Sequence, residues 1–241
     1  MSTSNRHASL AQELSDLLGL SVPPIAIRFA TEDDTGLPAF GGKMPPPTPD
    51  GRTGVVPAGC VFWMHATDRS FATTAADHAN CSVGSFTHGF KSLDEVVGNA
   101  DVQALLAVKW ISPEAAMGIP TLAQKPRTVV YGPLAEVADQ PDIVFLRLNG
   151  KQLMLLNDAW PALRFEGKPQ CHIIPLAVNT GDIAVSSGCM LSRVRTGMSN
   201  NEVTCAIPAA KLPELIGRLT EARAADLQAA AYAAEDSRRF V

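Results

Sequence analysis

The sequence of 241 residues is poor in charged and aromatic side chains and has no long hydrophobic run. Charged residues make up 18% of the chain, and 20 Lys and Arg against 24 Asp and Glu give a net charge of -4. Nucleic-acid binding needs a basic surface, so this balance argues against a protein that binds DNA or RNA. The absence of a run of about 18 apolar residues argues against membrane insertion. The hydrophobic content of 46% excludes disorder along the whole chain.

Several local motifs are missing as well. No Cys-x-x-Cys pair forms a local zinc-binding knuckle, and Gly41-Gly42-Lys43 lacks the spacing of a phosphate-binding loop. No cysteine lies in a nucleophile elbow or a papain-like signature. Nucleophilic catalysis by Cys81 with His78 or His88 as its base is therefore a third-ranked hypothesis.

The five cysteines are the most informative residues of the sequence. They are odd in number and widely spaced, which does not suit a disulfide framework. Residues 1–7 lack the apolar region of a secretory signal, so we expect a cytoplasmic protein with reduced thiols. A metal site would have to be assembled from distant segments of the chain.

The pattern of hydrophobic residues predicts one α/β domain over residues 1–241, with α+β as the alternative. We expect a mixed sheet flanked by helices, a long Pro/Gly-rich loop over 31–59 that is either a mobile insertion or a lid, and an Ala-rich helix and tail over 220–241. Small residues allow close helix approach, so we expect a homodimer through that helix. The expected helices are 10–18, 60–66, one from 77 to past 88, 93–108 with an interruption near 98–99, 150–163, and one from 212 that runs on past 219 into the Ala-rich segment. The expected strands are 25–29, 71–75, 128–131, 142–148, 172–175, 183–185 and 203–207.

Short segments spread along the chain form one pattern. They are PPIAIRF (23–29), Cys60, NCSVGSFTHGF (80–90), PDIVFL (141–146), KQLM (151–154), GCMLSRV (188–194) and VTCAIP (203–208). From about Leu10 to Leu219 this pattern resembles the DUF169 family, whose function is largely unassigned. The resemblance implies a fold and a set of cysteines but no reaction, and the loop over 31–59 is longer than the family's usual connection.

The resemblance divides the cysteines into four and one. Cys60, Cys81, Cys171 and Cys189 match cysteines of the family, whereas Cys205 is peculiar to this chain. Cys205 alternates with Val203 and Ile207 in an expected strand, so we predict that it packs in the core.

The four matching cysteines lie beside chain breaks or small residues, where backbone N–H groups stabilise a thiolate. Four thiolates could hold a [4Fe-4S] cluster, and three would leave one iron open to a substrate. Buried thiols that bind nothing are the simpler alternative. A zinc site is a further alternative, since His78 lies three residues before Cys81 and His172 adjoins Cys171.

Four other residues are candidates for catalysis. His65 and His88 could act as acid or base near neutral pH, although packed histidines are the simpler interpretation. Arg193 and Arg195 follow Cys189 and could hold a carboxylate substrate or balance the charge of a cluster, with an ordinary exposed helix as the alternative. Trp63 could shield a cluster from water or pack in the core.

Two functional hypotheses result. The first is a cytoplasmic enzyme that uses an iron-sulfur cluster or another thiolate-bound metal on a small organic molecule, in redox or lyase/hydratase chemistry. The second is a non-catalytic module that binds a small molecule or a partner and whose metal is structural.

Overall fold

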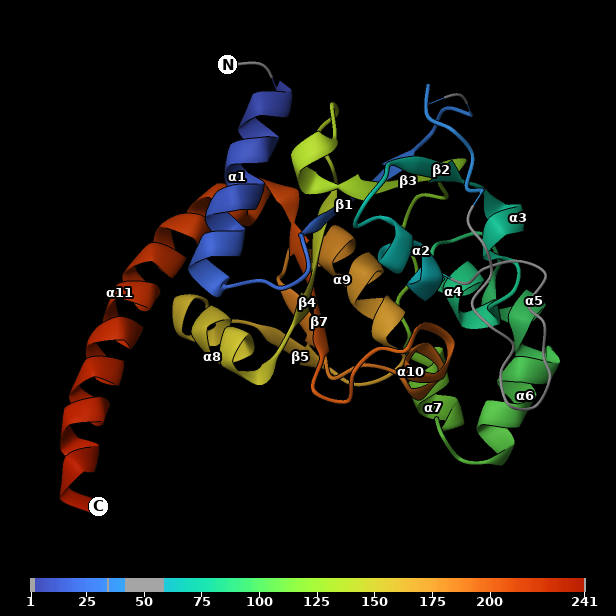
Figure 1. Cartoon of the computed structure of the whole chain (residues 1–241). Coiled ribbons are helices and arrows are strands. Elements are labelled where there is room, and N and C mark those ends of the chain that lie inside the picture. Colours follow the sequence, from blue (N-terminus) through green and yellow to red (C-terminus); the bar gives the residue numbers. More distant parts are fainter. Residues whose placement is uncertain (1–2, 34, 42–58, 241) are drawn as a thin grey trace.

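The computed structural model describes residues 3–33, 35–41 and 59–240 (Figure 1). The expected lid over 31–59 therefore lies largely outside the described residues. The described chain forms one α/β domain, as predicted, built on a mixed seven-stranded sheet.

The sheet has the strand order β2-β3-β1-β4-β7-β6-β5. Neighbouring strands are antiparallel except for β5 and β6, which are parallel. The strands are β1 (Ile25–Ala30), β2 (Phe71–Thr73), β3 (Thr128–Pro133), β4 (Ile143–Leu148), β5 (Arg164–Glu166), β6 (Ala184–Ser186) and β7 (Val203–Pro208).

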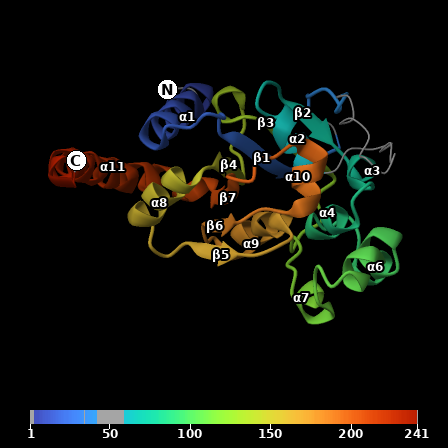
Figure 2. The ribbon, with the colours of Figure 1, turned by 60° about the horizontal axis from the view of Figure 1, so that its bottom comes forward.

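Helices cover both faces of the sheet, and a group of short helices extends one end of the domain (Figures 1 and 2). The α-helices are α1 (Thr3–Leu18), α2 (Gly59–His65), α3 (Ala75–His78), α4 (Ser82–Thr87), α5 (Leu93–Val97), α6 (Ala100–Ala107), α7 (Pro113–Met117), α8 (Gly150–Ala159), α9 (Ile173–Thr180), α10 (Met190–Thr196) and α11 (Leu212–Asp236). The 3₁₀ helices are η1 (Leu134–Glu136), η2 (Gln170–His172), η3 (Ala209–Lys211) and η4 (Ser237–Phe240).

The central strands are buried on both faces, and their side chains alternate between two cores. On β4, Val144 and Leu146 pack with α1, α8 and α11, while Ile143 and Phe145 pack with α2 and α9. The sheet therefore separates two hydrophobic compartments, and the parity of a residue on a strand decides which compartment it enters.

Most expected elements are present, but two predictions were wrong. The segment 172–175 was expected as a strand and instead forms η2 and the start of α9. Its continuous apolar run fits a helix buried on most sides as well as a buried strand. The single helix expected over 77–88 is two helices, because Cys81 adopts an extended conformation with φ of -137° and ψ of 107°. Strand β5 and helix α7 were not anticipated.

Helix α11 begins in the core and ends far from it. Leu212, Leu215 and Leu219 are buried against the sheet, whereas Leu227 and Tyr232 are 55% and 69% exposed. Figure 1 shows the second half of α11 projecting past the domain. Among the described helices, none is both long and apolar enough to cross a bilayer.

We predict that two leucines of α11 contribute very differently to stability. Replacing Leu215, which is fully buried, by alanine should lower the free energy of unfolding by about 2–5 kcal/mol, because it removes buried methyl groups and leaves a cavity. Leu227→Ala on the same helix should cost less than about 0.5 kcal/mol. Urea denaturation of both variants would test this, and equal losses would contradict the packing described above.

Candidate functional site: a cavity walled by four cysteines

The four cysteines that match the family pattern line one cavity. Cys60 comes from α2, Cys81 from the start of α4, Cys171 from η2 and Cys189 from the start of α10. Helix α2 contacts α10, and α4 contacts η2, so two pairs of elements bring four distant segments together. The cavity has a volume of about 30 Å³. Its remaining lining residues are Gly59, Trp63, Val83, Gly84, Trp110, Pro169, Gln170, Leu191 and Ser192.

Two of the cysteines are helix N-cap residues. Cys81 caps α4, and its sulfur accepts the backbone N–H of Gly84 at 3.4 Å. Cys189 caps α10, and its sulfur faces the backbone N–H groups of Ser192 and Leu191. Donors of this kind favour the thiolate over the thiol.

Burial and mutual repulsion act against the thiolate form that the backbone donors favour. Burial raises the pKa of Cys171 well above its usual range, and the nearby Cys81 and Cys189 raise it further. The pKa of Cys189 is also raised by burial, in spite of its backbone donors. These thiols are therefore close enough to repel one another when charged, in surroundings that screen charge poorly. Burial therefore favours the neutral thiol at Cys171 and Cys189.

Two polar side chains in the cavity wall have no hydrogen-bond partner among the described residues. Trp63 is 3% exposed and its indole Nε1 is unpaired, and Gln170 is 2% exposed with both amide atoms unpaired. Leaving such groups without a partner costs about 1–3 kcal/mol each. A polar or charged group placed in the cavity would find two unused donors there.

A buried histidine pair lies behind the cysteines. His88 donates from Nδ1 to the Gly84 carbonyl at 2.9 Å and accepts at Nε2 from the Tyr131 hydroxyl at 3.3 Å. His78 lies against His88 with the two rings tilted by 41° and their centroids 4.8 Å apart, and its Nε2 lies 3.1 Å from the Thr73 hydroxyl. Burial lowers the pKa of His88 to about 4 and that of His78 well below 6.5. Both rings are neutral at physiological pH, and His88 has both nitrogens occupied.

Neither His65 nor Arg193 lines the cavity. His65 is half-buried at the end of α2 and packs edge-on against Phe40. Arg193 donates to the backbone carbonyls of Ser187 and Glu202 at 2.8 and 3.1 Å, which holds the segments on both sides of α10 together. Arg195 lies in α10, and its side chain is outside the described part of the structure.

The structure also places the histidines of the expected mixed zinc site. His172 points toward Glu166, with Nε2 and Oε2 3.6 Å apart, and neither His172 nor His78 lines the cysteine cavity. Within the described residues, no group of three or more His, Cys, Asp or Glu side chains is arranged to hold a metal ion.

The fifth cysteine lies in the other compartment. Cys205 is fully buried on β7 among residues that pack with α1, α8 and α11, and burial raises its pKa. Cys60 and Cys171 pack against the opposite core, beside α2 and α9. The predicted core position of Cys205 is therefore confirmed, and the sheet separates it from the cysteine cavity.

Three residues around the cavity were not predicted from the sequence: Gln170, Thr87 and Tyr131. Gln170 precedes Cys171 directly, yet nothing in the local pattern distinguishes it from an exposed glutamine. Thr87 forms a hydrogen bond with the Cys171 thiol. Tyr131 lies near Cys171 and Cys60, and its pKa is raised chiefly by burial and further by these two cysteines. Both Thr87 and Tyr131 come from segments whose contact with the cysteines follows only from the tertiary fold.

Fold and cavity together define an α/β protein whose thiols, supplied by four separate segments, meet beside one face of a mixed sheet. The model of the DUF169 family, described as uncharacterised ArCR, matches residues 13–218, and the chain belongs to this family. No curated protein and no solved structure matches the chain significantly.

We predict that His88 makes the fold sensitive to acid. Its pKa is about 4 in the folded state against 6.5 for an ordinary histidine, so the unfolded chain binds the proton more readily. The associated stability is complete above pH 6.5 and is lost as the pH falls toward 4, by up to about 3 kcal/mol. Chemical denaturation of wild type and His88→Gln across this range should show a smaller pH dependence in the variant. His65→Gln is the control, and an equal pH dependence in wild type and His88→Gln would contradict the prediction.

Proposed function

We propose that this protein binds an iron-sulfur cluster, of the [4Fe-4S] type, through Cys60, Cys81, Cys171 and Cys189. The observation that carries the proposal is the convergence of these four cysteines, and not of Cys205, on one buried cavity. Cysteine thiolates are the usual ligands of such clusters, and four of them complete the ligand set. The cytoplasm, where thiols stay reduced, is the location that suits this site.

The residues around the cavity fit such a group. Four thiolates in an apolar wall would repel one another, and iron ions remove that penalty when they take the place of the protons. The N–H of Gly84 already points at the Cys81 sulfur, and a Cβ at Gly84 would lie 3.6 Å from that sulfur. The unpaired N–H groups of Trp63 and Gln170 offer further donors to sulfur.

A cluster suits this arrangement better than a zinc ion does. A single zinc ion needs its ligands close around one point, with Zn–S bonds of about 2.3 Å, whereas a cluster holds its cysteines several ångströms apart on separate irons. Zinc remains the alternative metal for the site.

The chemistry that the ligand set favours is electron transfer. A cluster bound by four cysteines has no open coordination position, and the apolar wall with Trp63 and Trp110 limits the access of water. Redox chemistry on a small organic molecule is the enzymatic activity that would suit this arrangement. Lyase or hydratase chemistry would require one cysteine to leave its iron open to the substrate. His65, His88, Arg193 and Arg195 stay candidates for the acid, base and anion-binding roles in such a reaction.

The alternative function is a non-catalytic module whose metal is structural. The buried, neutral state of His78 and His88 favours this alternative, since neither ring lines the cavity. In that case metal binding would contribute directly to folding, and loss of one ligand would unfold the chain.

The first test is anaerobic reconstitution with iron and sulfide. We expect wild type and Cys205→Ala to take up about four irons and four sulfides per chain, with visible absorption near 400 nm that disappears on reduction, in keeping with [4Fe-4S] chemistry. Cys81→Ser and Cys189→Ser should lose most of this iron. Colourless wild-type protein without iron, sulfide or zinc by elemental analysis would refute the proposal. The melting temperature of the metal-free variants separates a structural from a redox role, because a structural metal stabilises the fold heavily.

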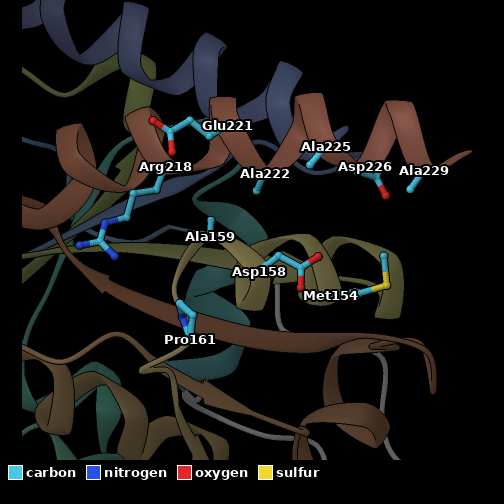
Figure 3. A pocket seen from close by; sticks show the side chains of 10 residues that line it. All are labelled: Met154, Asp158, Ala159, Pro161, Arg218, Glu221, Ala222, Ala225, Asp226 and Ala229. Atoms are coloured by element: carbon cyan, nitrogen blue, oxygen red, sulfur yellow. The ribbon is translucent and has the colours of Figure 1, made fainter.

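We also propose self-association along α11. A groove of about 790 Å³ lies between α8 and α11, and Ala222, Ala225 and Ala229 line its α11 side (Figure 3). Asp158, Glu221 and Asp226 line the groove together with one basic residue, Arg218, while α11 is followed by Arg238 and Arg239 (Figure 3). Antiparallel pairing of two projecting α11 helices would bring these opposite charges together and cover small apolar residues.

Sedimentation equilibrium tests this pairing. We expect a dimer at micromolar concentration, and Ala225→Arg should convert it to a monomer because a long charged side chain would separate the helices. Ala107→Arg, on α6 at the other end of the domain, is the control and should stay dimeric. Wild-type protein that is monomeric at micromolar concentration would contradict the proposal.

A further inference from the structure

The cysteine cavity contains two donors that the fold itself does not use. The indole N–H of Trp63 and the amide of Gln170 are buried, line the cavity and have no hydrogen-bond partner among the described residues. Buried polar groups are normally paired, so such exceptions point to a ligand or to a role in function.

Both donors are tied to the elements that carry the cysteines. Trp63 follows Cys60 by three residues on α2, which places the two side chains on neighbouring positions of one helix face. Gln170 directly precedes Cys171 in η2, and its own backbone N–H faces the sulfur of Cys189. Each donor is therefore fixed relative to at least one sulfur that would hold the cluster.

We propose that Gln170 and Trp63 donate hydrogen bonds to the sulfur atoms of the bound cluster and thereby set its reduction potential. This inference rests on the proposed function. Reduction adds an electron and increases the negative charge on the cluster sulfurs, so an N–H donor stabilises the reduced form more than the oxidised form. The effect is large in an apolar cavity, where little water competes with the donor. Both residues act on the cluster through hydrogen bonds to its sulfur atoms, and neither is a ligand of iron.

The cavity offers a matched pair of substitutions. Trp63 and Trp110 both line it, but Trp63 alone of the two has a buried indole nitrogen without a partner. Trp110 is half-buried, and its ring packs under the Lys168 ammonium at 4.6 Å. Tryptophan to phenylalanine removes the N–H at either position and keeps an aromatic ring in the wall. For Gln170, methionine has a similar length and shape and no donor.

The experiment is a redox titration of the full chain, reconstituted anaerobically with iron and sulfide. We expect Gln170→Met and Trp63→Phe each to lower the equilibrium constant for one-electron reduction about tenfold, which is about 59 mV in midpoint potential. Trp110→Phe should leave the potential unchanged. The visible spectrum and the iron content should stay as in wild type, because the four ligands are untouched.

The outcomes separate this inference from the proposed function. If all chains bind the cluster and Gln170→Met and Trp63→Phe titrate as wild type does, the inference is overturned and the proposed function stands. Equal shifts in Trp63→Phe and Trp110→Phe would also overturn it, because the effect would then come from packing. Wild-type protein that takes up no iron overturns both. If one of the two donor variants fails to bind the cluster, the other decides.

Discussion

The burial of the central strands on both faces is the constraint on which the rest of the structure depends. Because β1, β4 and β7 are largely buried on both faces, most of their successive side chains enter one of two hydrophobic compartments. Helices α1, α8 and α11 close one compartment, and α2 and α9 close the other. The cysteine cavity exists beside the second compartment because α2 and η2, the N-terminal neighbour of α9, both pack there. A shift of one residue in the register of β7 would exchange Cys205 with Ala206 and alter both cores.

The same constraint explains why the site is built from chain breaks and not from one local motif. A helix that packs on the sheet turns only one face toward the core. Side chains at the first residues of such helices can therefore point into a cavity at the edge of the core. Cys81 and Cys189 occupy such starts, where backbone N–H groups are free to face a sulfur. The opposing effects at Cys189, where donors lower and burial raises the pKa, leave burial dominant. Such a site is poorly suited to a free thiolate and well suited to thiolates whose charge is balanced by metal.

The sequence predicted the fold class and most elements, because alternation and helical spacing are local signals. It succeeded for Cys205, whose parity on β7 is readable from its neighbours Val203 and Ile207. It failed at 172–175, where Ile173 and Ile174 are buried against the core and no periodicity separates helix from strand. The break at Cys81 was also invisible, since it depends on an extended backbone within a helical pattern. The grouping of four cysteines came from a family resemblance, and their convergence on one cavity became visible only in three dimensions.

The unpaired polar atoms could not be predicted from the sequence, because whether a side chain lacks a hydrogen-bond partner depends on the tertiary packing around it. Gln170 is typical of an exposed residue, and its burial follows from the packing of η2 between α4 and the start of α10. A protein that needed only a stable core would replace Gln170 and the N–H of Trp63 by apolar groups of the same shape, which removes the penalty of an unpaired donor. Their unpaired donors in a wall that is otherwise apolar support the proposed function. Under the proposed function, the four thiols would be the ligands of a cluster, and the two donors would face its sulfur atoms.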